Sequence, residues 1–486
     1  MTGDVIHDLF LIATFAVYAL AIYNCIRIIS QNLNPQTAMA WIMVNIAFPW
    51  IGVPLYFLIG QNRLRRYARL RQHSEVRLTT LKSGDAEPDA TDIPYASPHY
   101  DLFHRVLTRM NRNFRPRPCR VELLIDGENA FPAIFQAITE ARHYIFVQYY
   151  ILRADRLGLE LKRLLIDKAR SGVAIYLIFD DIGSFWLNRS YVRELEKAGV
   201  QVARFLPLNL PGSLQVNFRN HRKLVLVDGS VAFTGGLNVG DEYVGKSRLA
   251  YWRDTHVRVE GAAVNALKDV FLTDWYFAAK KRIKLAPLKI AGALGESPPP
   301  PAPTVNAQAQ VVPFGPNDKD FIGILLFMQI IQAAQKRLWI ATPYFVPDIA
   351  LERMLELAVL RGVDVRILIP QKSDHHVVYW VSLSYAHELR SRGLKIYLYT
   401  KGFMHQKVMV IDDTVAVLGT SNFDNRTFYL NFETVLVLHS LDVNRQTAAM
   451  LEADFKDSVQ LEPGVSELSR LDDFRIKLAR LLAPLM

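Results

Sequence analysis

The stretch Gly402 to Glu433 reads GFMHQKVMVIDDTVAVLGTSNFDNRTFYLNFE. Within it, Lys407 to Ile411 is apolar and β-branched apart from its lysine, which predicts a buried strand. Asp412 and Asp413 mark a turn, and Thr414 to Leu418 predicts a second strand. The stretch therefore predicts two strands joined by a tight turn.

Polar residues flank this pair of strands. His405 and Lys407 are two residues apart, so on a strand their side chains project from the same face. Gly419 provides the bend that presents Ser421 and Asn422. An imidazole, an ammonium group and an amide together predict a phosphate site, in which lysine and asparagine hold the oxygens while histidine attacks or donates a proton.

The same pattern occurs earlier, in Asn220 to Asn238, which reads NHRKLVLVDGSVAFTGGLN. Two unrelated strands with buried histidines are the simpler interpretation, but they would not share five residue types at five identical offsets. One phosphate needs an attacking group and a protonating group on opposite sides, so the two motifs predict one shared site. The matching residues are His221, Lys223, Asp228, Gly235 and Asn238 in the first copy and His405, Lys407, Asp412, Gly419 and Asn422 in the second.

Strands and helices alternate on both sides of a proline-rich break, Gly295 to Pro303. Matching turns at 171–173 (SGV) and 361–363 (RGV) mark an internal repeat. The alternation implies a largely parallel or mixed sheet with helices outside, in two halves that face each other. The predicted strands are 121–125, 144–150, 174–180 and 200–205, then 337–341, 364–369 and 395–399; the predicted helices are 129–141, 157–171 and 191–198, then 321–334, 350–361 and 377–391.

Two apolar segments precede these halves. Residues 5–26 and 39–59 predict a transmembrane helical hairpin, in which Pro49 and Pro54 favour a kinked or re-entrant second segment. The arginines within 63–71 place the chain beyond the hairpin in the cytoplasm by the positive-inside rule, and they also suit anionic headgroups. A cleaved signal peptide is the alternative, but the N-terminus is acidic and lacks a cleavage motif.

Composition restricts the partners. The net charge of +10 and the pI near 9.4 suit an anionic partner, and both nucleic acid and anionic lipid qualify. The two cysteines, Cys25 and Cys119, fit neither a disulfide framework nor a zinc site, which favours a catalytic region on the reducing side of a membrane. The sequence shows no constellation of metal ligands.

Two further segments have open alternatives. Residues 206–219 have no counterpart before the second motif and predict either a lid that contacts acyl chains or a plain surface loop. Residues 471–486 alternate apolar and basic side chains, and either lie on a membrane or pack on the second half.

Longer strings define a resemblance. Two HxKxxxxD motifs, each followed by a glycine and an asparagine, resemble the phospholipase D superfamily. Nearly the whole chain is similar to bacterial cardiolipin synthases. The strings that carry this similarity are GDEYVG (240–245), WRDTHVRVEG (252–261), TPYFVPD (342–348), RGVDVRILIPQKSDH (361–375) and AWIMVNIAFPWIGVPLYFLIGQNR (40–63).

The resemblance implies an α/β fold: two phospholipase D-like αβα sandwich halves form one pseudo-two-fold catalytic unit, preceded by an N-terminal transmembrane helical hairpin. The expected domains are the membrane hairpin at 1–72, a linker at 73–100, the first half at 101–296, a proline-rich linker at 297–304 and the second half at 305–486.

The resemblance also implies a function. A membrane-bound cardiolipin synthase would transfer a phosphatidyl group from one phosphatidylglycerol to another, through a phosphatidyl-histidine intermediate, to give cardiolipin and glycerol. It would lie in the bacterial inner membrane, bind anionic lipids rather than nucleic acid, and use no cofactor or metal. A phospholipase D-type phosphodiesterase that uses water or another alcohol is the alternative. A non-catalytic membrane scaffold would require degraded motifs, and both motifs are intact. A homodimeric assembly stays open.

Specific residues carry these roles. In the family a carboxylate downstream of the asparagine fixes each histidine, which assigns Glu433 to the second motif and Asp254 to the first. Asp228 and Asp412 belong to the motif, yet they sit on the opposite strand face, so holding the turn is an equally open role. The resemblance favours His221 as the nucleophile. The predicted residues are His221, Lys223, Asp228, His405, Lys407 and Asp412 for catalysis, and Asn238, Asn422, Asp254 and Glu433 for substrate binding.

Overall fold

The structure, a computed structural model, describes residues 2–30, 35–57, 98–207, 218–245, 251–283, 304–316, 318, 321–462 and 470–480. The chain divides into two compact units, one of Met1–Leu70 with Pro207–Phe218 and the other of Arg71–Leu206 with Arg219–Met486. Both histidine motifs lie in the second unit. The arginines of 63–71 lie outside the described residues, as do most of the predicted linkers 73–100 and 297–304 and most of the 206–219 segment.

The N-terminal unit contains α1 (Thr2–Ile29), α2 (Pro35–Ala47) and α3 (Pro49–Leu55). Among the described residues, one helix is long and apolar enough to cross a membrane, Val5–Ile29 of α1. The predicted second segment is divided between α2 and α3, because Pro49 lacks the N–H that would continue α2. Inside this unit the buried amide of Asn24 donates to Asn45 at 3.2 Å, which ties α1 to α2.

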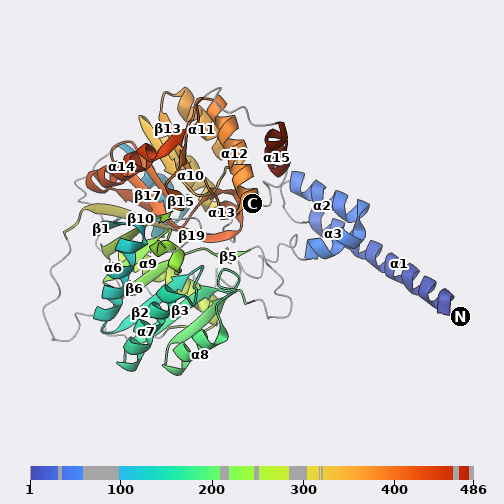
Figure 1. The fold of residues 1–486 in the computed structure, drawn as a ribbon, viewed down its shortest axis with the longest axis horizontal. Helices are drawn as coiled ribbons and strands as arrows, with labels where there is room; N and C mark the ends of the chain where they lie inside the picture. Colours follow the sequence, from blue (N-terminus) through green and yellow to red (C-terminus); the bar gives the residue numbers. More distant parts are fainter. Residues whose placement is uncertain are drawn as a thin grey trace. The chain divides into compact units, whose positions relative to one another are not determined.

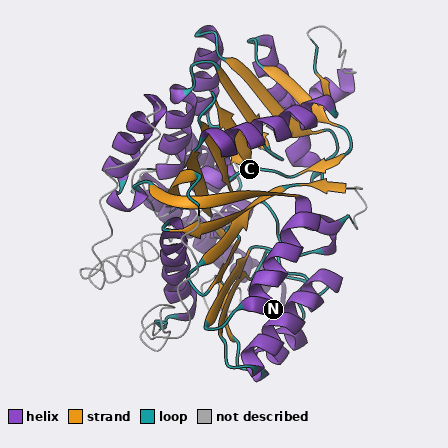
Figure 2. Ribbon diagram, turned by 90° about the vertical axis from the view of Figure 1, so that its left-hand side faces the viewer, coloured by secondary structure: helices purple, strands orange, loops and turns teal. Residues whose placement is uncertain are grey.

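One 16-stranded sheet runs through the second unit, and its two halves have matching strand orders. The first half runs β4-β3-β2-β6-β7-β9-β1 and the second runs β20-β14-β13-β11-β16-β17-β19-β10. The halves join where β1 and β10 pair antiparallel at the centre, with Cys119 opposite Ala307. Figure 2 shows the strands as one layer with helices on both faces.

The first half contains most of the predicted elements, with ends shifted by up to four residues. Its strands are β1 (Arg117–Ile125), β2 (Tyr144–Tyr149), β3 (Ala174–Asp180), β4 (Gln201–Phe205), β6 (Leu224–Val227), β7 (Val231–Gly235) and β9 (Thr255–Gly261). Its helices are α6 (Asp126–Glu140), α7 (Arg156–Arg170), α8 (Arg189–Lys197), α9 (Ala263–Ala279) and the short η3 (Asp241–Val244).

The second half repeats this arrangement in its strand order, and its elements have the yellow to red colours of Figure 1. Its strands are β10 (Ala307–Phe314), β11 (Arg337–Ala341), β13 (Asp364–Pro370), β14 (Lys395–Tyr399), β16 (Val408–Ile411), β17 (Val415–Gly419), β19 (Asn431–His439) and β20 (Ser458–Gln460). Its helices are α10 (Ile322–Ala333), α11 (Ile349–Leu360), α12 (His376–Ser391), α13 (Asn425–Tyr429), α14 (Leu441–Lys456) and α15 (Arg470–Arg480).

Each half has its own hydrophobic core. The first centres on residues such as Ile145, Val225 and Phe233, and the second on residues such as Ile340 and Val437. The helix α5 (Pro98–Met110) and the turn η2 (Arg112–Phe114) lie at the start of the range expected for the first half, 101–296, yet Phe103 and Leu107 are buried in the second core.

The C-terminal segment packs on the second half where it is described. Ile476 and Ala479 of α15 are buried in the second core, and Arg480 pairs with Glu388 of α12. Leu478 on the other side of the helix remains half exposed. Of the two alternatives drawn from the sequence, packing therefore holds for the described part of this segment.

Candidate active site

Two short strand pairs connect the halves and position the histidines. β5 (Arg219–Asn220) runs parallel to the start of β19, with Asn220 opposite Phe432. The equivalent β15 (Gly402–Met404) runs parallel to β8 (Tyr251–Arg253), with Met404 opposite Arg253. The residues that follow the first pair are His221 and Glu433, which are thereby brought side by side. The residues that follow the second pair, His405 and Asp254, are brought together in the same way.

Each histidine consequently binds the carboxylate of the opposite half. His221 Nδ1 lies 3.0 and 3.1 Å from the two carboxylate oxygens of Glu433. His405 Nδ1 lies 2.7 Å from Asp254 Oδ2. The sequence-based assignment of Glu433 to the second motif and Asp254 to the first was therefore wrong, because the pairs β5–β19 and β8–β15 cross between the halves.

The carboxylates are themselves held in place. Glu433 also accepts hydrogen bonds from the Thr420 hydroxyl and, at 3.1 Å, from the Asn431 amide. Asp254 Oδ1 accepts from the backbone N–H of Thr255 at 2.7 Å. Gly236 touches this carboxylate so closely that an added Cβ would fall 1.9 Å from Oδ1. These contacts fix the orientation of both acids and hence of both imidazoles.

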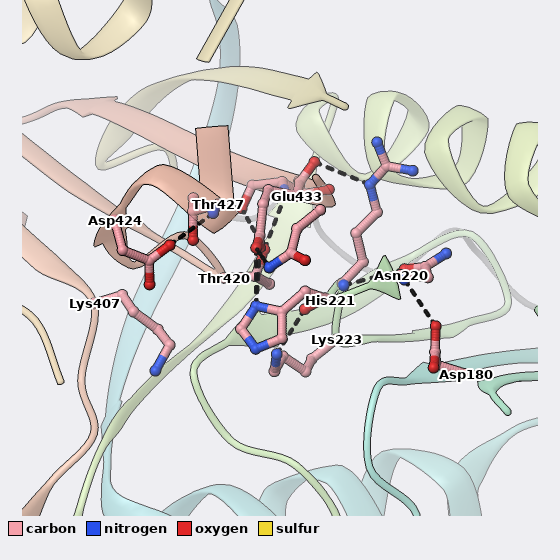
Figure 3. Close-up of polar contacts among 12 residues, drawn as sticks. Asp180, Asn220, His221, Lys223, Lys407, Thr420, Asp424, Thr427 and Glu433 are labelled. Carbon is pink, nitrogen blue, oxygen red and sulfur yellow. Dashed lines mark hydrogen bonds and ion pairs between the residues drawn. The ribbon is translucent and has the colours of Figure 1, made fainter. Parts of the chain in front are cut away.

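The two lysines lie in the same site. Lys223 Nζ donates to the carbonyl of His221 at 2.6 Å, and Lys407 Nζ donates to that of His405 at 2.5 Å. Figure 3 shows the nitrogen ends of Lys223 and Lys407 directed to the same side of the His221 ring. An ammonium group has three donors, so each lysine retains others for the oxygens of a phosphate.

Burial keeps both histidines neutral near pH 7. It lowers the pKa of His221 to about 4, against the raising effect of Glu433 and with a further lowering by Lys223 and Lys407. Burial and then Lys407 lower the pKa of His405 well below its usual range. Because each Nδ1 faces a carboxylate it must carry the proton, so each Nε2 presents a lone pair.

Burial also lowers the pKa of both lysines, well below the usual range for Lys223 and to about 8 for Lys407. It raises the pKa of Asp254 to about 6, although Lys407 opposes this. A bound phosphodiester anion adds negative charge among these groups, which favours the charged lysines and raises the pKa of a neighbouring histidine.

The two motif asparagines differ. Asn238 accepts from the backbone N–H of Ile151 at 3.1 Å and donates to the Tyr243 hydroxyl at 2.8 Å. Both the oxygen and the nitrogen of its amide therefore already have hydrogen-bond partners within the protein. The side-chain amide of the buried Asn422 hydrogen-bonds Asp424, and its carbonyl oxygen has no hydrogen-bond partner among the described residues. That oxygen can accept a hydrogen bond from a hydroxyl group of a ligand, but it cannot hold the oxygens of a phosphate.

The structure does not bring the motif aspartates to the histidines. Asp228 accepts the backbone N–H groups of residues 142–144 at 2.7 to 2.8 Å, and Asp412 accepts those of residues 335–337 at 2.7 to 3.2 Å. Each aspartate lies five positions after its lysine, and five positions of extended chain span roughly 16 Å. Their contacts hold the turns that precede β2 and β11, so these two predicted catalytic residues lie away from the reacting groups.

Aromatic residues that the sequence analysis did not assign surround the histidines. The Tyr150 ring lies 5.0 Å from that of His221. Trp252, Phe403 and Tyr243 lie 5.5 to 5.8 Å from that of His405. Nearness in the sequence to predicted site residues could have indicated two of them, since Phe403 lies shortly before His405 and Trp252 shortly before Asp254.

Two buried carboxylates outside the motifs support the site. Asp274 of α9 binds Arg222 at 2.6 Å, the residue between His221 and Lys223. Asp454 of α14 binds Gln406 at 2.8 Å, the equivalent residue of the second motif. Within the described ranges, no group of three or more histidine, cysteine or acidic side chains is arranged to hold a metal ion.

Several known proteins are similar to this chain in sequence or in fold. A family model described as "Cardiolipin synthase, PLD-like domain" matches residues 134–275 and 327–456, and one described as "Phospholipase_D-nuclease N-terminal" matches residues 16–61. The chain is 37% identical over 473 residues to the cardiolipin synthase of Geobacillus kaustophilus, covering 96% of this chain and 92% of that protein. It is 40% identical over 459 residues to cardiolipin synthase A of Pseudomonas aeruginosa, covering 93% and 91%.

A solved structure supports the fold. The phosphatidylserine synthase of Haemophilus influenzae superposes with a TM-score of 0.56 at 16% identity, over 78% of this chain and 99% of its own. The paired halves and the doubled histidine motif are those of the phospholipase D superfamily. The chain belongs to the cardiolipin synthase family. It is an enzyme, a phosphatidyltransferase.

Proposed function

We propose that this enzyme converts two phosphatidylglycerol molecules into cardiolipin and glycerol, through a phosphatidyl group held on a histidine. The observation that carries the proposal is the pair of buried, neutral imidazoles, each held through Nδ1 by the carboxylate of the opposite half. Two such histidines beside two lysines suit double displacement at one phosphorus.

The first displacement uses one histidine as nucleophile. Its Nε2 attacks the phosphorus of phosphatidylglycerol, a P–N bond forms, and the P–O bond to the glycerol headgroup breaks. The other histidine, protonated in the presence of the anionic substrate, transfers its proton to the departing glycerol oxygen. In line with the family, we assign the attack to His221 and the proton transfer to His405.

The second displacement reverses these roles. The now neutral His405 accepts the proton of a headgroup hydroxyl from the second phosphatidylglycerol, and that oxygen attacks the phosphorus. The P–N bond to His221 breaks, and cardiolipin leaves. One phosphodiester replaces another, so no nucleotide activation is required. Lys223 and Lys407 neutralise the non-bridging oxygens throughout.

Hydrolysis is the second candidate, with water as acceptor in the second displacement. The Nε2 positions do not distinguish water from an alcohol. The alcohol is favoured by the match to the cardiolipin synthase family and by the apolar helix α1, which would keep the enzyme at its lipid substrates.

A lipid extract decides between these reactions. Purified full-length protein is incubated with phosphatidylglycerol, and cardiolipin, phosphatidic acid and free glycerol are quantified. The proposal expects equimolar cardiolipin and glycerol, and no product from His221→Ala or His405→Ala protein that is folded and membrane-inserted. Phosphatidic acid as the main product would establish the hydrolase, and near-normal synthesis by either variant would refute the shared site.

We also propose the placement in the membrane. The hairpin of residues 1–72 crosses the inner membrane twice, and both halves, 101–296 and 305–486, lie in the cytoplasm beyond their linkers. Support comes from the apolar α1, the divided second segment and the arginines within 63–71. Reporter fusions at residues 32 and 75 test this: only the first should report the periplasm, and a periplasmic signal at residue 75 would invert the topology.

A further inference from the structure

A turn beside the site carries the most exposed large apolar side chain in the part of the chain that the structure describes. Residues 181–187, here called the aromatic turn, connect β3 to α8. Trp186 is 87% exposed and Phe185 is 63% exposed, and their rings meet edge to face at 5.3 Å. Adjacent aromatic side chains this exposed mark an interaction surface.

The aromatic turn is held firmly at its base. Asp180 Oδ1 accepts the backbone N–H groups of Ile182 and Gly183 at 3.0 and 2.9 Å. The Ser184 hydroxyl donates to the carbonyl of Tyr150 at 3.1 Å. An added Cβ at Gly183 would fall 2.3 Å from the same carbonyl oxygen, so only glycine permits this close packing. The exposed rings are therefore presented by a fixed support.

That support also builds the wall of the active site. The other oxygen of Asp180 accepts the backbone N–H of Asn220, the residue before His221, at 2.9 Å. Tyr150, which packs against the aromatic turn, contacts the ring of His221 and lies 5.6 Å from Lys223 Nζ. The exposed rings and the reacting groups are thus connected through two shared residues.

Two exposed arginines follow the turn, and its one acidic side chain, Asp181, lies 3.7 Å from the guanidinium group of Arg204. Arg189 and Arg193 are exposed one helical turn apart on α8, which begins directly after the aromatic turn. Trp prefers the interface between headgroups and acyl chains, and arginine is attracted to anionic headgroups. Together they fit the surface of an anionic bilayer.

The second half has exposed apolar residues at its own catalytic edge. Ile349, 68% exposed, opens α11 directly after β12 (Phe345–Val346), and β12 pairs with β18 (Phe423–Asp424), which follows the motif residue Asn422. Phe321 is 56% exposed and packs on Tyr429 at 5.6 Å. Both halves therefore expose apolar side chains near their catalytic residues.

We propose that the aromatic turn inserts into the headgroup region of an anionic bilayer and seats the mouth of the active site at the lipid surface. This inference rests on the proposed function, since a phospholipid substrate must pass from the bilayer to buried histidines. Phe185 and Trp186 provide the inserted side chains, and Arg189 and Arg193 hold the phosphate layer beside them.

The first test separates access to lipid from chemistry. Full-length Phe185→Ser/Trp186→Ser protein is assayed on vesicles of phosphatidylcholine with phosphatidylglycerol, and in detergent on monomeric short-chain phosphatidylglycerol. The vesicle rate should fall by at least about tenfold, because the double variant loses the burial of two large apolar side chains. The short-chain rate should stay within about twofold of wild type. Leu360→Ser is the matched control, because Leu360 is 78% exposed at the far end of α11, and both of its rates should be unchanged.

The second test detects insertion directly. Tryptophan quenching by brominated phosphatidylglycerol in vesicles is compared between wild type and Trp186→Phe, and the difference should show that Trp186 is quenched. Equal losses in both assays, no loss in either, an unquenched Trp186, or an altered oligomeric state of the double variant in detergent would each overturn the proposal. If wild type makes no cardiolipin from either substrate the proposed function fails, whereas quenching still reports on insertion.

Discussion

At the scale of single residues, the feature of the site with the most consequences is the exchange of carboxylates between the halves. Glu433 and His221 are 212 residues apart, and Asp254 and His405 are 151 apart. Each carboxylate fixes the tautomer of a histidine in the other half, so each acid should share the phenotype of the histidine that it contacts.

The exchange can be tested with a phosphatidyl donor that has a good leaving group, because such a donor needs no proton from the second histidine. If His221 is the nucleophile, Glu433→Gln should slow formation of the labelled enzyme by about 10- to 10,000-fold, because the imidazole loses its orienting partner. Asp254→Asn, which affects His405, should leave this step nearly unchanged. Labelling is measured in rapidly quenched samples; the account fails if Asp254→Asn behaves like His221→Ala.

His256 permits a separate prediction on pH and stability. This buried histidine on β9 has no partner for either ring nitrogen among the described residues, and burial lowers its pKa to about 4. The unfolded chain binds the proton near pH 6.5, so the stability present above pH 6.5 is lost as the pH falls toward 4. Between pH 7 and pH 5 this group should account for about 2 kcal/mol of lost stability.

His256→Leu should remove that contribution. Its thermal midpoint in detergent should therefore fall less than that of wild type between pH 7 and pH 5. The same fall in both proteins would show that His256 titrates normally, for example through contact with water.

At the scale of the elements, local sequence patterns correctly predicted the strands whose limits are set by neighbouring residues. β3, β11 and β14 have the predicted bounds, because each is a short apolar run between clear turn signals. The histidine and lysine of each motif lie in the extended chain before β6 and β16 rather than within a regular strand. Local sequence did not indicate β9, β10 and β19 at the centre of the sheet, nor the crossed pairs β5–β19 and β8–β15, since these depend on contacts distant in the chain.

Asp412 and Asp413 are adjacent, but replacing each of them by alanine should affect the stability of the protein very differently. Asp412 is buried and accepts three backbone N–H groups, whereas Asp413 is 62% exposed in its pairs with Lys336 and Arg337. Asp412→Ala should lower the free energy of unfolding by about 2 to 4 kcal/mol, because buried donors lose their acceptor. Asp413→Ala should change it by less than about 0.5 kcal/mol.

The activity of these two variants distinguishes a structural from a catalytic aspartate. The folded fraction of Asp412→Ala should retain kcat within a few-fold of wild type. Normal thermal stability combined with lost turnover would instead return Asp412 to the catalytic residues that the motif suggests.

At the scale of the whole molecule, one site is assembled from two halves, and each half contributes a lysine to it. Lys223 and Lys407 are the cations placed beside the histidines. Cardiolipin formation should therefore persist in saturating EDTA at constant ionic strength. A loss that zinc or magnesium specifically restores would contradict this, whereas a general increase with any divalent salt would not, because anionic lipid surfaces respond to counterions.

The residues of the site were largely predictable, but their partners were not. Repetition of the motif identified both histidines and both lysines. The positions of Glu433 and Asp254 followed from the family pattern, yet their pairing required the crossed strands. The sequence alone did not single out the aromatic turn, and only the exposure of Trp186 beside the site identified it.

The position of the covalent intermediate tests the proposed double displacement more directly than any other measurement. His405→Ala protein is mixed with a labelled phosphatidyl donor that has a good leaving group, quenched at alkaline pH and mapped by mass spectrometry. If His221 is the nucleophile, this variant should carry an acid-labile, base-stable phosphatidyl group on His221, and His221→Ala should carry none. The same adduct on His405 of His221→Ala protein would exchange the two roles. No adduct with any donor, in samples that demonstrably turn over, would contradict the covalent mechanism and favour direct transfer between the two lipids.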